Sequence, residues 1–257
     1  MSEKLWYLKN CPLLDRLGPD ELRRIEIASR ARNFPRKSPV YLPADASTSV
    51  FLLASGRVKL CHITPDGKQS ILAFIEPGEI FGELSMLDDG DREEYAEALE
   101  NSTVVMIPRD TIQQLMESHA GLTLGITKMI GLRRRRIERR LKNLLFLSNR
   151  QRLVHLLLEL AEQYGQQTGD GIALGIKLSH QDLANVIGST RETVTVVLGE
   201  LQSEDLVAVG RRKITLLKPD QLAAGVDRSA PTIPAEKQPI TTPHLTARNA
   251  VPADEAH

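Results

Sequence analysis

The feature that most constrains this fold is a pair of short helical patterns that meet at one glycine. The first begins at Ser179, a favourable N-cap, and ends at Gly188, which suits a left-handed C-cap. Ser189 follows at once and precedes Glu192 by three residues, which is the spacing of a capping box at a second helix. Ala184, four residues before the glycine, is small enough for two helices to cross closely. The pattern therefore predicts a helix-turn-helix.

The second helix of this pattern has one buried and one exposed side. Its apolar positions Val194, Val197, Leu198 and Leu201 share one face. The opposite, N-terminal turn is the part that such helices insert into the major groove of DNA. Arg191 can form two hydrogen bonds with guanine, and Glu192 can accept one from cytosine. A role in capping the second helix explains Glu192 equally well. We expect DNA contacts from Ser179, Gln181, Ser189, Thr190, Arg191, Glu192 and Thr195.

A strand pair is expected directly after the second helix. Leu206–Val209 and Ile214–Leu217 are apolar and flank a basic turn. A hairpin beside a recognition helix forms a wing, and its cations contact phosphates without reading bases. Solubilising surface is the alternative explanation for these charges. We therefore expect phosphate contacts from Arg211, Arg212 and Lys213.

A much longer helical pattern spans Leu122–Leu147. Its apolar residues recur at intervals of seven and four, so they form a narrow stripe along the helix. One helix cannot bury such a stripe alone, and we expect a second copy of the chain to cover it as a homodimer. The stripe, called the seam below, consists of Ile130, Ile137, Leu141 and Leu144.

The same helix carries many cations, at Arg133–Arg136, Arg139, Arg140 and Lys142. We expect a solvated face here, and DNA contact is the alternative. Arg134 falls on the seam itself. An arginine at such a position weakens a simple zipper, so either the helices separate there or the guanidinium binds an anion.

Short strands dominate the first part of the chain, after a helix expected over Asp20–Ala31. Val58–Ile63 and Ile71–Ile75 read as a hairpin around the turn residues Pro65–Lys68. Many short strands with frequent turns predict a small sandwich or barrel-like roll. Further strands are expected at Val40–Leu42, Glu79–Phe81 and Thr103–Ile107.

Four other segments complete the pattern. Asp110 and Gln113 have capping-box spacing, which predicts a short helix starting there, and Arg150–Tyr164 is a second amphipathic helix. Gly165–Gly171 is expected to be a polar loop. Residues 227–257 are rich in Pro and Thr and too polar to bury a core, so we expect a disordered tail.

Composition excludes several classes of protein. Lys+Arg and Asp+Glu both total 33, so only local charge can indicate nucleic acid. No signal peptide or membrane-spanning apolar run is present, which predicts a soluble cytoplasmic protein without membrane contact. Cys11 and Cys61 lack CxxC spacing, so free thiols and no metal site are expected. Without a P-loop, metal-ligand cluster or nucleophile elbow, the chain is not expected to be an enzyme.

Together these features resemble the Crp/Fnr superfamily of transcription regulators over about residues 5–222. Gly188–Thr195 is similar to the family's recognition-helix motif, and Arg191 and Glu192 match its base-reading pair. Gly78–Leu84 resembles the opening of the phosphate-binding cassette of cyclic-nucleotide-binding β-rolls. In place of the second arginine that some members carry, this chain has Val196, so no operator sequence can be transferred.

The resemblance implies an α+β fold with an N-terminal antiparallel β-roll of the double-stranded β-helix or jelly-roll type. A long dimerisation helix and a C-terminal winged helix-turn-helix follow it. The implied function is a transcription regulator that binds a pseudo-palindromic operator as a homodimer, with RNA polymerase as a further partner. The expected boundaries are 1–118 for the sensor, 119–148 for the dimerisation helix, 149–226 for the DNA-binding domain and 227–257 for the tail.

The sequence departs from cyclic AMP binders at the effector site. In those proteins an arginine and a hydroxyl residue follow Gly-Glu-Leu and hold the cyclic phosphate. This chain has Arg92-Glu93-Glu94 instead, so a carboxylate would face the phosphate of the ligand. Ile137-Glu138 replaces the adenine-contacting Thr-Ser pair. We expect cyclic AMP to bind weakly or not at all, and Arg92 to bind another anion or pair with its acidic neighbours. The candidate effector residues are Gly82, Glu83, Leu84, Arg92, Glu93 and Arg134.

No cofactor is evident from the sequence. The four-cysteine pattern of the iron–sulfur branch of the family is missing. A haem ligand from Cys61 or His62, or another small ligand, is an open alternative, although an isolated Cys-His pair is more often ordinary surface or core. The competing function is a ligand-binding module without a DNA role, which the helix-turn-helix and the basic wing argue against.

Overall fold

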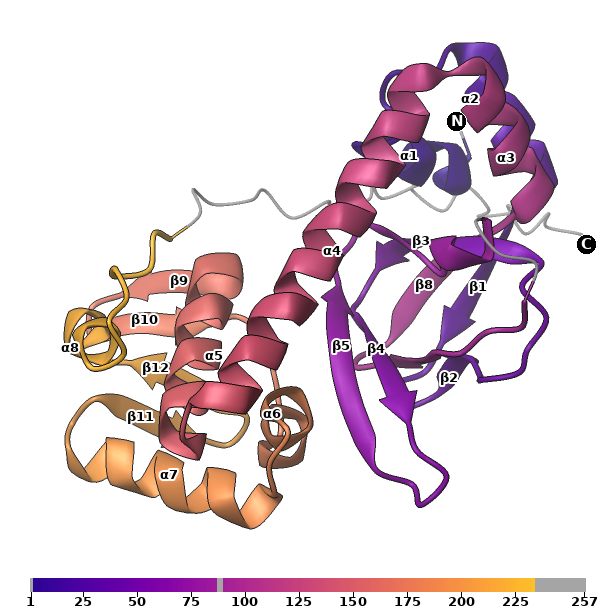
Figure 1. Ribbon diagram of the computed structural model, residues 1–257. Helices are drawn as coiled ribbons and strands as arrows, with labels where there is room; N and C mark the ends of the chain where they lie inside the picture. Colours follow the sequence, from indigo (N-terminus) through magenta and orange to yellow (C-terminus); the bar gives the residue numbers. More distant parts are fainter. Residues whose placement is uncertain (1, 87–89, 234–257) are drawn as a thin grey trace, which may run out of the picture.

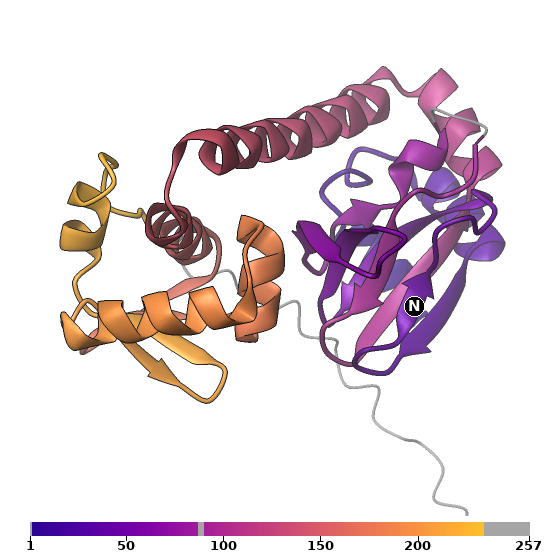
Figure 2. The ribbon, with the colours of Figure 1, turned by 60° about the horizontal axis from the view of Figure 1, so that its bottom comes forward.

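The computed structural model describes residues 2–86 and 90–233. Figures 1 and 2 show two lobes, with the long helix α4 running from one to the other. The helices are α1 (Glu3–Lys9), α2 (Pro19–Ala28), η1 (Glu83–Met86), α3 (Arg109–Ser118), α4 (Ala120–Phe146), α5 (Asn149–Tyr164), α6 (His180–Ile187), α7 (Arg191–Ser203) and α8 (Pro219–Ala224). Within the described residues, no helix is both long and apolar enough to cross a membrane.

The N-terminal lobe contains two four-stranded antiparallel sheets, with strand orders β1-β8-β3-β6 and β2-β7-β4-β5. Aromatic rings fill the space between them, and the ring centroid of Phe51 lies 5.2 Å from that of Tyr41 and 5.2 Å from that of Phe81. This confirms the expected β-roll. Its strands are β1 (Arg30–Phe34), β2 (Pro39–Tyr41), β3 (Ser49–Ser55), β4 (Val58–Ile63), β5 (Gln69–Ile75), β6 (Ile80–Phe81), β7 (Tyr95–Ala98) and β8 (Ser102–Pro108).

The expected hairpin is confirmed as β4 and β5, and the three further strands are confirmed as β2, β6 and β8. Strands β1, β3 and β7 were not predicted. Strand β3 is apolar on both faces, because Val50 and Leu52 pack beneath the helices while Phe51 and Leu53 face the other sheet. A strand that is buried on both sides shows no alternation, so periodicity alone did not reveal it.

Two helix boundaries in this lobe differ from the expectation. Helix α2 ends at Ala28 instead of Ala31, because the following residues pair with β8 as strand β1. Helix α3 begins at Arg109 with Pro108 as its N-cap and no side-chain cap, so the predicted capping box at Asp110 is wrong. The helix follows strand β8 directly, and the chain therefore needs no separate start signal there.

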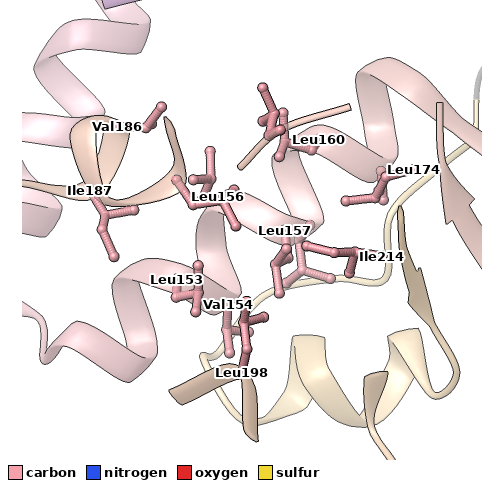
Figure 3. Close-up of a cluster of buried hydrophobic side chains, with 14 of the residues drawn as sticks. Leu153, Val154, Leu156, Leu157, Leu160, Leu174, Val186, Ile187, Leu198 and Ile214 are labelled. Carbon is pink, nitrogen blue, oxygen red and sulfur yellow. The ribbon is translucent and has the colours of Figure 1, made fainter. Parts of the chain in front are cut away.

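The C-terminal lobe is built around α5, whose leucines pack against the other helices and the sheet (Figure 3). Its four-stranded sheet has the order β11-β12-β10-β9. The predicted polar loop Gly165–Gly171 is wrong, because these residues belong to a hairpin. Its outer strand is an exposed edge, so its polar composition resembles that of a loop. The strands are β9 (Gly165–Thr168), β10 (Gly171–Leu174), β11 (Val207–Gly210) and β12 (Lys213–Leu216).

The two lobes touch directly as well as through α4. Cys61, Ile71 and Phe74 of the β-roll belong to the same apolar cluster as the helix-turn-helix. Beside them, Lys59 on β4 is 6% exposed, and its Nζ lies 3.2 Å from Glu97 and 3.3 Å from Asp182 on α6. A buried ammonium group shared between the lobes links the first helix of the helix-turn-helix to the β2-β7-β4-β5 sheet.

The expected tail does not begin at residue 227. Arg228 donates to the carbonyl of His155 at 3.2 Å and to Glu162 at 2.6 Å. Pro231 is buried and Ile233 packs against the core of the C-terminal lobe. The start of the predicted disordered segment is therefore wrong, and the rest of that prediction, 234–257, lies outside the described residues.

Candidate DNA-binding surface and effector pocket

Helices α6 and α7 form the predicted helix-turn-helix. Ala184 and Val194 are fully buried where the helices cross. Gly188 caps α6 with φ 63° and ψ 50°, and a Cβ there would lie 3.0 Å from Leu144 of α4. The left-handed backbone favours glycine at this position, and a larger residue would also have to displace the Leu144 side chain.

The start of α7 differs by one residue from the expectation. Thr190, and not Ser189, is the N-cap, and its hydroxyl accepts a hydrogen bond from the Thr193 amide at 3.1 Å. The predicted capping box at Glu192 is therefore wrong. Arg191 and Glu192 both lie exposed in the first turn, where the helix N-terminus faces solvent.

One groove collects most of the predicted DNA-binding residues. It lies between the start of α6, the start of α7 and the wing, and its volume is about 410 Å³. We call it the recognition groove. It is lined by Ser179, His180, Gln181, Arg191, Arg211, Arg212 and Lys213 together with apolar residues and a glycine from the β10–α6 connection and the wing. Three segments that are separate in the sequence thus present one surface.

Ser189, Thr190, Glu192 and Thr195 lie outside the lining of the recognition groove. Thr195 is engaged within the protein, since its hydroxyl donates to the Arg191 carbonyl at 2.9 Å and lies 2.8 Å from Nδ1 of His180. His180 itself was not predicted. Its position directly after the Ser179 N-cap, in the first turn of α6, was the available signal.

The wing carries its charges at a tight turn. Gly210 pairs with Lys213, and Arg212 between them has φ 56°, so the turn projects from the sheet. Arg211 and Arg212 are exposed. Neither they nor Arg191 makes an ion pair with another described residue. Their guanidinium groups are free to bind an external anion.

A second cavity, of about 430 Å³, lies between the β4–β5 hairpin, η1 and α4. We call it the effector pocket. Its lining includes the predicted Glu83, Leu84, Glu93 and Arg134 but neither Gly82 nor Arg92. The lining carries charges of both signs, with carboxylates at Glu83, Glu93, Glu94, Glu138 and Glu159 and cations at Arg133, Arg134, Arg136 and Arg140.

Arg92 faces the interior of the β-roll and not the effector pocket. Its side chain donates to the Ser49 carbonyl, and the guanidinium carbon lies 4.3 Å from the ring centroid of Tyr41 and 4.8 Å from that of Phe51. Burial lowers the pKa of Arg92. A Cβ on Gly82 would lie 2.7 Å from Nη1 of Arg92, so the glycine makes room for this orientation. The structure therefore divides the predicted effector residues, because Arg92, Gly82, Leu84 and Glu93 line a neighbouring cavity of about 520 Å³, and Glu83 and Arg134 do not.

Arg133 of α4 occupies the inner wall of the effector pocket instead. It donates to Glu83 at 2.7 Å and to the Ile80 carbonyl at 2.5 Å. Glu83 is 5% exposed, so this ion pair is buried. Burial, followed by the charge of Glu83, raises the pKa of Glu94 to about 7. Glu83 on this wall therefore already has a cation as its partner.

The expectation of a solvated arginine face on α4 is wrong for two residues. The side chains of Arg133 and Arg140 are 14% and 20% exposed. Arg140 donates to the Leu72 carbonyl at 2.9 Å and to Glu159 at 3.3 Å, which joins α4 to β5 and α5. Arg134, by contrast, is 79% exposed and pairs with Glu138 within the helix.

The residues considered for haem and metal ligation are separated in the structure. Cys61 is fully buried between the lobes, and burial raises the pKa of its thiol to about 12. His62 lines the effector pocket. Cys11 is buried among the N-terminal helices. No group of three His, Cys, Asp or Glu side chains among the described residues could hold a metal ion.

Comparisons with known proteins agree with this geometry. Residues 31–119 match the model of the cyclic nucleotide-binding domain, and residues 151–224 match that of the Crp-like helix-turn-helix domain. The chain is 31% identical to the global nitrogen regulator of Nostoc sp. over 74% of this chain and 86% of that protein. It is 30% identical to the cyclic AMP receptor protein of Thermus thermophilus over 79% and 91%.

Solved structures show the same architecture. A CRP-family transcriptional regulator from Thermus thermophilus has a TM-score of 0.65 and 26% identity, covering 77% of this chain and 98% of that chain. A CooA mutant from Carboxydothermus hydrogenoformans, with a TM-score of 0.68 and 24% identity over 78% and 88%, shares the fold. The sequence motifs, the fold and these relatives lead to one conclusion: the chain belongs to the Crp/Fnr family of transcription regulators.

Proposed function

We propose that this regulator binds DNA as a homodimer and reads a pseudo-palindromic operator with the recognition groove. The observation that carries the proposal is the convergence of α6, α7 and the wing on one exposed basic surface. Arg191 stands at the start of α7, where a helix in the major groove meets base edges. Arg211, Arg212 and Lys213 are placed to neutralise phosphates beside it.

The exposed seam supports the dimer. Ile137, Leu141 and Leu144 are 43%, 54% and 46% exposed, and Leu145, four residues after Leu141, extends the apolar surface. Ile130, the first seam residue, is half-buried against the N-terminal core. A contiguous apolar surface on a long helix is stabilised by a second copy, and a two-fold dimer presents two recognition grooves to two half-sites.

The effector pocket is proposed to bind a small molecule other than cyclic AMP. A cyclic phosphate in this pocket would meet Glu83 and Glu94, and the arginine that faces them, Arg133, is already paired. A ligand that replaces Glu83 as the partner of Arg133 would change the position of α4 and, through α4, that of the helix-turn-helix. At a promoter, the DNA-bound dimer is proposed to act on RNA polymerase, with no enzymatic activity of its own.

Binding-site selection from a random DNA library, with the full chain, tests the proposed function. We expect enrichment of a pseudo-palindrome whose half-sites lie about 34 Å apart, each with a G·C pair that faces Arg191. A chain that enriches no sequence, yet binds small molecules, would be a ligand-binding module without a DNA role.

Sedimentation tests the dimer. Ile137→Asp places a charge on the seam and should produce monomers with little DNA affinity. Lys128→Asp, a residue on the opposite side of the same helix, is the matched control and should remain dimeric. An unchanged dimer for Ile137→Asp would show that another surface holds the two copies together.

A further inference from the structure

A third cavity, of about 400 Å³, lies where α4 meets α5 and α6. We call it the basic cavity. It is separated from the effector pocket by Arg140 and Glu159, which line both. Its lining is Arg139, Arg140, Lys142, Asn143, Leu147, Arg152, His155, Leu156, Glu159, Val186, Ile187 and Arg228.

The charges of this lining are unbalanced. Five Arg and Lys side chains surround the cavity, and Glu159 is the single carboxylate in its lining. Glu159 pairs with Arg140 at 3.3 Å, and Arg228 pairs with Glu162 at 2.6 Å. The remaining cations, Arg139, Lys142 and Arg152, form no ion pair with another described residue. Crowded cations in a recess raise the local potential, and an anion relieves their mutual repulsion.

The same wall contains donors that the protein leaves unsatisfied. The Nε atoms of Arg140 and Arg152 are buried without a hydrogen-bond partner among the described residues. The Nη groups of Arg152 are occupied, since they donate to the Ile187 carbonyl at 2.8 Å and to Asn149 at 2.5 Å. Buried donors without acceptors are costly, and guanidinium groups match phosphate geometry well.

We propose that the basic cavity binds a small molecule that carries one or more phosphate groups. Arg139 and Lys142 would provide exposed cations at its entrance, and the Arg140 and Arg152 guanidinium groups would form its inner wall. The volume is in the usual range for a small-molecule site. This ligand site is separate from the effector pocket.

The dimer leaves this site open. Successive helix residues advance by about 100°, so Arg139 and Asn143, each two positions after a seam residue, lie about 200° around α4 from Ile137 and Leu141. The basic cavity therefore faces away from the proposed partner helix. A ligand there has access from solvent in the same dimer that binds DNA.

Arg140 connects the basic cavity to the effector pocket. The same guanidinium group bonds to the Leu72 carbonyl of β5 and to Glu159. An anion that attracts Arg140 toward the basic cavity weakens these bonds and changes a wall of the effector pocket. By linkage, ligands of the two cavities then alter each other's affinity by the same factor.

Isothermal titration of the full chain with inorganic pyrophosphate tests the proposal. We expect saturable binding that the double variant Arg139→Gln, Lys142→Gln weakens about tenfold for each cation removed. Both side chains lie on the surface, so the variant should fold. The double variant Lys128→Gln, Arg135→Gln removes equal charge from the same helix outside the cavity and should leave the affinity unchanged.

Three outcomes would overturn the proposal. Pyrophosphate fails to bind saturably, or both double variants reduce the affinity equally, which indicates non-specific charge attraction. In the third outcome, the cavity variant weakens binding of operator DNA and flattens its salt dependence, while pyrophosphate does not bind. That result would assign the basic cavity to the DNA backbone.

Discussion

The recognition groove and the effector pocket use the same residue type in opposite ways. Arg191 and Arg212 are exposed and make no ion pair with a described residue, whereas Arg133 and Arg140 are largely buried and each already has a carboxylate. The groove can therefore accept an external anion without rearrangement. An anion that binds Arg133 or Arg140 in the pocket must first displace Glu83 or Glu159. An arginine that the fold leaves without a partner is thus the readier of the two to bind an external anion.

The strongest test of this difference removes a free arginine. Arg191→Ala should cost about 1–3 kcal/mol of DNA affinity at each half-site, and about 2–6 kcal/mol for the dimer, because the variant cannot make the bidentate bond to a base. The free energy of unfolding should not change. Selection with the variant should also relax the preference at one base pair. If affinity falls but the selected sequence stays the same, Arg191 contacts phosphate instead of a base.

Removing a paired arginine should affect stability instead. Arg133→Met leaves Glu83 buried without its cation, so the free energy of unfolding should fall by about 3–5 kcal/mol in denaturant titrations. Adding Glu83→Gln should restore part of this stability. Arg134→Met is the matched control, since its exposed pair with Glu138 should contribute less than about 1 kcal/mol. Equal effects of the two single variants would contradict the distinction drawn between buried and exposed pairs.

The effector pocket should also make the stability of the chain depend on pH. The pKa of Glu94 is raised from 4.5 to about 7 in the folded chain. The unfolded chain releases this proton first, so stability should fall as pH rises from 4.5 toward 7, by at most about 1.4 kcal/mol per pH unit. Glu94→Gln should remove this slope in unfolding curves. Glu93→Gln, at the exposed neighbour, should retain it, and identical slopes for wild type and Glu94→Gln would refute the assignment.

The smallest expected effect concerns the wing. Arg212→Ala should weaken binding to all DNA sequences about equally and lower the salt dependence by about one unit, because one phosphate is no longer neutralised. Fluorescence anisotropy at several salt concentrations measures this slope. Arg24→Ala, which removes an exposed cation from α2 in the other lobe, is the control and should leave the salt dependence unchanged. A change in sequence preference for Arg212→Ala would place the wing tip in a base-reading role.

The helix-turn-helix could be predicted closely because its signals are local. Ser179 caps α6 and Gly188 ends it, as expected, and the only shift was from Ser189 to Thr190 at the start of α7. Both residues are good N-caps, so sequence preference does not distinguish them. The wing was also predicted, yet the groove that unites it with α6 became visible only in the folded chain.

The sequence by itself determined the long helix, the β4–β5 hairpin and the recognition helix α7, because each depends on residues that are close to one another in the chain. Tertiary structure alone decided which charges are free. Arg92, Arg133 and Lys59 find their partners 43, 50 and 123 positions away in the chain. Periodicity and capping describe neighbours in sequence, and they do not specify which distant carboxylate or carbonyl a long, flexible cation will meet. The free arginines of the groove and the paired arginines of the pocket therefore look alike until the chain is folded.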